Sequence, residues 1–351
     1  MKTSSLRMLA IAAMLPASAC AQSNVTIYGA IDAGLRYQTD VDAAGRNQLT
    51  ATSGNSYSNR LGFRGEESLG NGLTARFRLE SGFNSKTGAL DNTKNMLFNR
   101  TASAGIGGKW GYIDLGRQYT IGFRTELFLD PFDHHFTPIV PISSGAGTSL
   151  PAAATAAGLG ASASTGTRFN NDVQYTGTFG ALTLRAERAL GEDPADADRG
   201  SASAAGFSYA GTHLLAAGAY TRKETAAGFA NRAFIVGGGV KWNGIVAKAG
   251  LSRERQDTAT QGVLQHELRF AGVRLPVAPA LALTTGIYRA DYDSAAGGGR
   301  RKLYIASLTY AFSKRTNVYA EFDVNRYDGL LVPASQQHGQ RGVSLGVMQA
   351  F

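Results

Sequence analysis

Arginine side chains recur at even spacings in two segments of the chain, at Arg60 and Arg64 and then at Arg76 and Arg78. Arg36 holds the corresponding place in an earlier segment. Even spacing puts side chains on one face of an extended strand. Fixed arginines on one face can attract anions, but each would carry a heavy desolvation cost in a packed core. The pattern therefore predicts a basic wall in contact with water.

A second charged group lies in the long connection from about residue 120 to 167, whose first part carries Glu126, Asp130 and Asp133 among large apolar residues. Connections of this length are usually functional or disordered. We expect this one to fold inward, to anchor through its apolar residues and to present its carboxylates to the arginine wall. Facing acidic and basic walls would orient and select permeating solutes by charge and width. The alternative is that these carboxylates are ordinary solvated loop charges.

The later part of this connection, residues 143–166, consists almost entirely of Ala, Gly, Ser and Thr. Such a composition can bury little apolar surface. We assign it no function.

The elements that must position these charges are strands. Residues 26–37 alternate between an apolar face with Ile27 and Ile31 and a polar face with Asp32 and Arg36, which is typical of a half-buried strand. The same alternation runs to the end of the chain, with connections that alternate between short and long. The expected strands are 24–37, 58–67, 72–83, 97–106, 111–119, 168–176, 181–190, 201–210, 213–223, 231–242, 245–256, 265–275, 280–292, 301–312, 317–328 and 341–351.

Sixteen such segments predict an all-β fold, a transmembrane antiparallel β-barrel with short periplasmic turns and long external loops. A closed barrel satisfies every backbone amide in lipid, which an open sheet edge could not do. After the first 21 residues no apolar run approaches the roughly 18 residues of a membrane-spanning helix. A secreted β-sandwich would also alternate and is the soluble alternative.

The first 21 residues resemble a secretory signal peptide. Lys2 and Arg7 precede an apolar stretch, and Ala19, Cys20 and Ala21 form a small-residue cleavage site. The alternative is a lipoprotein signal that uses Cys20. Cleavage would leave residues 22–351 as a single barrel domain without cysteine, which excludes disulfides and thiolate sites.

The mature chain would carry 33 basic residues against 26 acidic ones, a net charge of +7. Such an excess favours anionic solutes through the summed field of the protein. Nucleic acid is not an expected partner, because export and strand-alternating arginines fit a pore wall better.

Five sequence motifs, in order along the chain, resemble the general diffusion porins of β-proteobacteria, which include the neisserial porins. They are residues 22–34, 58–73, 115–118 and 313–316, and the terminal Phe351. The resemblance implies an outer-membrane channel for passive diffusion of small hydrophilic solutes and ions. It further implies a homotrimer whose third loop, residues 120–167, folds into the pore and faces basic wall residues.

The resemblance supports three residues as parts of the basic wall and three as parts of the acidic loop, and it makes Phe351 a signal for the outer-membrane assembly machinery. Arg64, Arg76 and Arg78 rest on the alternation alone. Arg117 shares parity with the apolar Leu115, so it faces the lumen only if a bulge near Gly116 changes the register. The residues that the resemblance supports are Arg36, Arg60 and Arg117 for the wall and Glu126, Asp130 and Asp133 for the loop.

The remaining expectations concern partners and rival functions. We expect contacts with outer-membrane lipid and lipopolysaccharide and no cofactor or metal, because the histidines show no ligand spacing. An outer-membrane enzyme and a non-conducting adhesin barrel are the alternatives. An enzyme would need a matched nucleophile, base and orienting group, and no spacing in the sequence selects such a set. The histidines are His134, His135, His213, His266 and His338.

Overall fold

The computed structural model describes residues 24–351 except 93, 140–165, 226, 260–261 and 334. The expected signal peptide and nearly all of the Ala/Gly/Ser/Thr segment lie outside the described residues. The elements are β1 (Asn24–Gln38), β2 (Gln48–Ser53), β3 (Arg60–Gly70), β4 (Leu73–Gly82), β5 (Thr101–Gly108), β6 (Gly111–Tyr119), α1 (Ile121–Leu129), β7 (Arg168–Phe179), β8 (Leu182–Ala189), β9 (Ala202–Ala210), β10 (Leu214–Glu224), β11 (Ala230–Trp242), β12 (Ile245–Thr258), β13 (Gly262–Ala278), β14 (Leu281–Ser294), β15 (Gly297–Ala311), β16 (Thr316–Gly329) and β17 (Gly339–Ala350).

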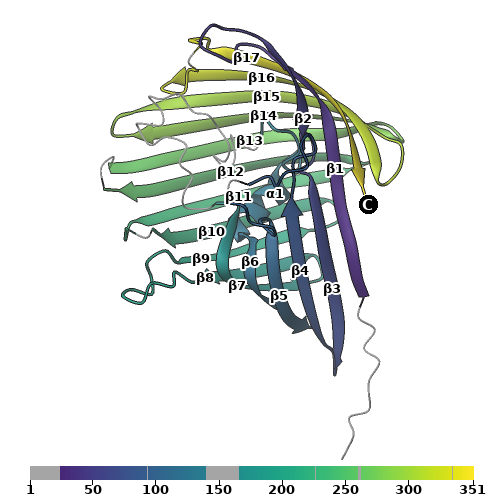
Figure 1. Cartoon of the computed structure of the whole chain (residues 1–351), viewed down its shortest axis with the longest axis vertical. Coiled ribbons are helices and arrows are strands. Elements are labelled where there is room, and N and C mark those ends of the chain that lie inside the picture. The colour runs from purple at the N-terminus through teal and green to yellow at the C-terminus, as the bar shows by residue number, and fades with distance from the viewer. Residues whose placement is uncertain (1–23, 93, 140–165, 226, 260–261, 334) are drawn as a thin grey trace, which may run out of the picture.

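The strands form one closed antiparallel sheet, a ring whose strands curve around α1 in Figure 1. β1 closes the ring because one of its edges pairs with β17. Its other edge pairs first with β3 and then, further along, with β2. β2 and β3 therefore occupy one position in the wall, and the barrel has sixteen strand positions. The predicted fold class and strand number are confirmed.

The sequence did not predict β2. Its six residues, Gln48–Ser53, form a segment shorter than the other strands and are mostly polar or small, with Leu49 as the single large apolar residue. They become a strand because the edge of β1 at Ala33–Gln38 needs hydrogen-bonding partners. Between β2 and β3 the chain leaves the wall at residues 54–59.

The outward face of the barrel is apolar. On β1, Val25 and Ile27 are 59% and 61% exposed, whereas Asp32 on the opposite face is fully buried. A large apolar side chain is stable in such an exposed position when lipid surrounds it. Among the described helical residues, none forms a segment long and apolar enough to cross a membrane.

The third long connection folds into the barrel, as predicted. α1 begins after Thr120, whose hydroxyl accepts a hydrogen bond from Phe123 N at 3.2 Å. The helix packs against the inner face of β8–β12, inside the ring (Figure 1). Its apolar side chains and those that follow it are buried against Ala, Leu, Ile and Tyr side chains of β9–β16. The loop thus fills one half of the lumen and leaves the half beside β1 and β3–β8 open.

Candidate pore constriction

The open half of the lumen contains a cavity of about 710 Å³. Positive side chains outnumber negative ones in its lining, with five arginines and two carboxylates. Four of the arginines come from the wall strands β3, β4 and β8, and the fifth comes from α1. The charged lining residues are Arg64, Arg76, Arg78, Arg124 and Arg185, with Glu66 and Asp114.

Three wall arginines that the sequence predicted line this cavity, but they differ in their partners. Arg76 forms an ion pair with Asp114 of β6. Arg78 donates a hydrogen bond to the hydroxyl of Tyr28 at 3.0 Å. Arg64 has no carboxylate partner among the residues that the structure describes. Part of the basic wall is therefore left without an internal counter-charge.

Sequence reasoning missed Arg124 and Arg185. Arg185 lies on β8 and donates to Ser208 Oγ at 3.3 Å. Arg124, on α1, donates to the backbone oxygen of Tyr119 at 3.3 Å. Burial, with the nearby charges of Arg185 and Arg78, lowers the pKa of Arg124 to about 10, so it stays protonated at neutral pH. Here the loop adds a cation to the basic wall, where the sequence had led us to expect carboxylates.

Arg36 and Arg60 lie elsewhere in the lumen. The buried Arg36 is 3.2 Å from Glu321 and 2.7 Å from Asp323, both on β16, so its charge is neutralised within the wall. Arg60 lies over the ring of Tyr57, 4.3 Å from its centroid, and donates to the backbone oxygen of Ser58.

Arg117 does not face the lumen, in contrast to its expected role. Its guanidinium donates to the backbone oxygen of Asn99 at 2.7 Å and to the side chain of Asn170. A register shift does occur beside Gly116, but the extra residue is on β7. β6 therefore keeps its parity, with Gln118 toward the cavity and Arg117 outward with Leu115.

The three loop carboxylates do not face the arginine wall either. Asp130 is fully buried and accepts hydrogen bonds from His134 N at 2.7 Å and from the hydroxyl of Tyr288 on β14. Asp133 is exposed and lies 2.6 Å from Lys248 Nζ of β12. Glu126 is largely buried and lies 3.4 Å from His134 Nε2. Asp130 and Asp133 thus fasten the loop to the wall behind it, and Glu126 is paired within the loop. These contacts correct the expectation that the three carboxylates form an acidic face of the pore.

Asp32 organises the chain between β2 and β3. Its fully buried carboxylate accepts hydrogen bonds from the backbone N–H groups of Asn55, Ser56 and Tyr57 at 3.0, 3.2 and 3.1 Å. The hydroxyl of Tyr319 on β16 donates to the same carboxylate at 3.0 Å. One wall residue thereby holds residues 54–59 in their inward fold.

These inward-folded residues in turn hold the tip of the loop. Phe136 N donates to the backbone oxygen of Ser56 at 3.2 Å. Thr137 Oγ1 donates to Asn55 Oδ1 at 2.8 Å. The ring of Phe136 also packs edge-on against Tyr319, with centroids 5.4 Å apart. We call Asp32 and residues 54–59 the loop clamp.

A family profile described as Gram-negative porin matches residues 8–330. The chain belongs to the Gram-negative porin family. It is 37% identical over 142 residues to an outer membrane porin protein of Bordetella pertussis, covering 36% of each chain. It is 32% identical over 183 residues to outer membrane porin protein 32 of Delftia acidovorans, covering 52% of this chain and 48% of that one. The matches thus span about a third to a half of the length of these relatives.

Solved porin structures share the fold of the whole barrel. An anion-selective porin from Comamonas acidovorans superposes with a TM-score of 0.81 at 20% identity, over 94% of this chain and all of that one. The trimer form of OmpT from Vibrio cholerae gives 0.68 at 14% identity, over 94% and 99% of the two chains. With its family and its barrel, this porin is a protein of the Gram-negative outer membrane.

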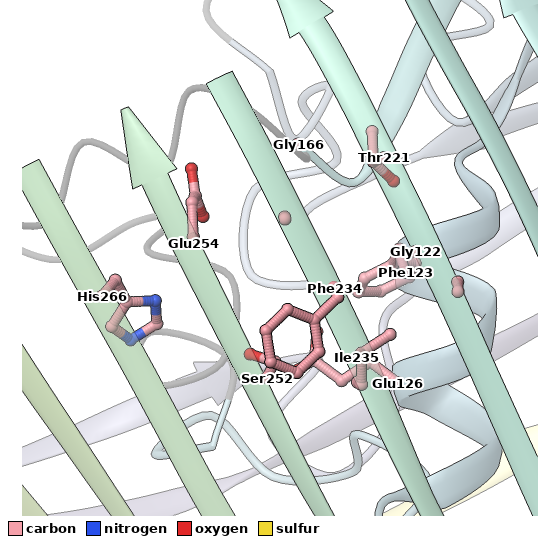
Figure 2. A pocket seen from close by; sticks show the side chains of 12 residues that line it. Gly122, Phe123, Glu126, Gly166, Thr221, Phe234, Ile235, Ser252, Glu254 and His266 are labelled. Atoms are coloured by element: carbon pink, nitrogen blue, oxygen red, sulfur yellow. The ribbon is translucent and has the colours of Figure 1, made fainter. Parts of the chain in front are cut away.

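Behind α1 the porin has a second, much smaller cavity of about 30 Å³, enough for one water molecule (Figure 2). His266 Nε2 is buried there without a hydrogen-bond partner in the described part of the chain, and Glu126, which is paired with His134, also lines the cavity. The described residues contain no cluster of His, Cys, Asp or Glu able to hold a metal ion.

His134 should make the attachment of the loop depend on pH. Burial disfavours its charged form, but the field of Glu126, with those of Asp130 and Asp133, outweighs burial and raises the pKa of His134 above 6.5. The carboxylates stabilise the protonated ring of His134. The stabilisation of the loop by this ring is therefore complete below about pH 6.5 and is lost as the pH rises through the raised pKa of His134. Fluctuations of the single-channel current are therefore expected to grow as the pH rises through this range.

His135 provides the matched control. Burial lowers its pKa to about 4, so it is neutral throughout this pH range. His134→Gln should abolish the pH dependence of the current fluctuations, whereas His135→Gln should retain it. Wild-type fluctuations that do not change with pH would contradict this role of His134.

Proposed function

We propose that this porin forms a water-filled channel for passive diffusion of small hydrophilic solutes and ions, with a preference for anions. The observation that carries the proposal is the unequal lining of the 710 Å³ cavity, five arginines against two carboxylates. Such a lining raises the local concentration of anions and lowers that of cations. The family is one of channels, which favours this function over an enzyme.

The pore wall we propose consists of Arg64, Arg76, Arg78, Arg124 and Arg185. Arg60 adds positive charge to the lumen near the loop clamp. The charge of Arg36 is paired with Glu321 and Asp323, so Arg36 is a structural part of the wall. Asp114 and Glu66 are the opposing charges in the cavity. The loop carboxylates hold α1 in place.

The test is the conductance of purified porin in a planar lipid bilayer. We expect stepwise, ohmic channels and, in a salt gradient, a reversal potential with the sign of anion flow. Because salt screens fixed charges, the preference should weaken as the ionic strength rises. Absence of conductance steps would contradict the channel, whereas cation preference would contradict only the selectivity.

We further propose that the porin assembles as a homotrimer through the side of the barrel that includes β1, β4 and β5. Their outward-facing residues are uncharged along the full strands, and Ala75, Ala102 and Ala104 would allow close approach of a second barrel.

Phe351 pairs with Gly29 through both backbone groups, at 3.1 Å each, and its ring is half exposed. Such a ring is available for recognition by the assembly machinery.

A further inference from the structure

Tyr28, on β1, contacts two arginines of the cavity wall through one aromatic ring. The Cζ atoms of Arg64 and Arg78 lie 5.4 and 5.5 Å from the centroid of this ring. A guanidinium within about 6 Å of an aromatic centroid is attracted by the negative face of the ring. Both arginines are therefore held by the same neutral side chain.

Arg64 and Arg78 need such a contact because they are direct cross-strand partners, on β3 and β4. Both line the 710 Å³ cavity, so their charges lie side by side on the inner face of the barrel. Like charges in this arrangement destabilise a sheet unless something compensates them. Among the described residues, no carboxylate forms an ion pair with either arginine. The ring of Tyr28 thus compensates part of both charges.

The hydroxyl of Tyr28 adds a second contact to Arg78 alone. It accepts a hydrogen bond from Arg78 Nε at 3.0 Å and donates one to Glu80 Oε2 at 2.9 Å. Glu80 is 2% exposed and also accepts a hydrogen bond from Arg100 Nε at 2.7 Å. Tyr28 therefore connects Arg78 to a buried carboxylate with which Arg78 forms no ion pair of its own.

Gly62 provides the space that the Tyr28 side chain needs. Tyr28 is the cross-strand partner of Gly62, and Gly62 is the partner of Glu80 on the next strand. The Tyr28 side chain must therefore cross β3 at Gly62 to reach Glu80. A Cβ atom on Gly62 would lie 2.4 Å from Tyr28 Cζ, a distance at which the ring would have to move. The position of the ring depends on the absence of a side chain at residue 62.

We propose that Tyr28 is a positioning residue for the selectivity of the pore. It holds Arg64 and Arg78 against the inner wall and so fixes the place at which a permeating anion meets their charges. The proposal rests on the anion-preferring channel proposed above and adds to it the group that orders the charges. Without the ring, the two guanidinium groups repel each other and leave the wall, so that the field in the cavity and the width of the passage both fluctuate.

The position of the two arginines is tested by their rate of modification with phenylglyoxal, a reagent for guanidinium groups, in purified full-length porin. Peptide mass spectrometry gives the rate for each arginine. A cation–π contact at a partly exposed site changes an equilibrium by about two- to fivefold. Tyr28→Leu should therefore raise the modification rates of Arg64 and Arg78 by about two- to fivefold.

Two further variants separate the ring from the hydroxyl. Gly62→Ala leaves Tyr28 in the chain but displaces its ring, so it should raise the modification rates of both arginines. Tyr28→Phe keeps the aromatic face and removes only the hydrogen bond to Arg78. It should raise the rate of Arg78 and leave that of Arg64 at its wild-type value.

Tyr112→Leu is the matched control. Tyr112 also contacts an arginine of this wall, with its ring centroid 3.7 Å from Arg76 Cζ. Arg76 is additionally held by its ion pair with Asp114. We expect this variant to leave the modification rates of the two arginines beside Tyr28 unchanged. Equal rates in the Tyr28→Leu porin and the wild type, or an equal rise in the Tyr112→Leu porin, would overturn the proposal.

Bilayer recording tests the consequence for permeation. The variance of the open-channel current should rise by about two- to fivefold in the Tyr28→Leu porin and stay at the wild-type level in the Tyr112→Leu porin. Adding Arg64→Gln to Tyr28→Leu should remove the rise, because Arg78 then has no like charge opposite it. Faster modification with an unchanged variance would overturn the role of Tyr28 in permeation. A wild-type porin without conductance steps would contradict the channel itself, and the modification rates would still decide whether Tyr28 positions the arginines.

Discussion

Replacing Arg64 and Arg185 together with glutamate is expected to reverse the charge preference of the pore. Both residues line the cavity and neither has a carboxylate partner in the described chain. A unit charge about 4 Å from an ion contributes about 1 kcal/mol in water and about 4 kcal/mol near a protein surface. Each reversal should thus change the ratio of anion to cation permeability by about fivefold or more. The reversal potential in a salt gradient measures this ratio.

Arg117→Glu is the matched control because it makes the same charge change on the outward face of β6. We expect the reversal potential of this variant to equal that of the wild type. A shift as large as that of the double variant would show that Arg117 faces the lumen. No shift in the double variant would remove the arginine wall as the source of selectivity.

Asp32→Asn is expected to release the tip of the third loop and so to raise both the conductance and the current noise. Asparagine keeps one acceptor oxygen, but its amide group would face backbone N–H groups that also donate. A hydrogen bond to a charged acceptor contributes about 1.5 to 3 kcal/mol. Its loss would weaken the loop clamp while most wall pairings remain. Single-channel recording measures release of the loop tip, and thermal unfolding measures loss of barrel stability, so the two measurements distinguish these effects.

Asp40→Asn is the control for this variant, since Asp40 follows β1 just beyond its last residue and lies outside the loop clamp. It should leave conductance and noise unchanged. An Asp32→Asn porin with a lower unfolding temperature but a quiet channel of wild-type size would mean that Asp32 stabilises the barrel without positioning the loop.

The barrel could be predicted from the sequence because every strand must alternate between lipid and lumen, and alternation is a local property. β2 escaped prediction because its pairing depends on the free edge of β1 and not on its own residues. Parity alone also put Arg64, Arg76 and Arg78 in the lumen, as the structure does. The same counting gave Arg117 an outward position, which only an assumed bulge could change.

The direction in which the loop faces could not be predicted, because it depends on contacts between distant segments. Asp130 and Asp133 are directed away from the arginine wall by Tyr288 and Lys248, more than 100 residues further along the chain. Arg124 could not be predicted because it lies on a helix within the connection, where strand alternation assigns no face. Arg185 could have been found, since it occupies a lumen position in a strand that the alternation had already identified.

The loop clamp also sets the order in which the barrel can be completed. Asp32 and Tyr319, which meet in the clamp, are separated by 287 positions in the sequence. Contacts between such distant residues form late, because the intervening chain must first be organised. The tip of the loop, at Phe136, finds its finished docking site only when the last strands have closed on the first. The passage through the barrel is therefore narrowed in the final stage of assembly, and a barrel that has not closed would lack its constriction.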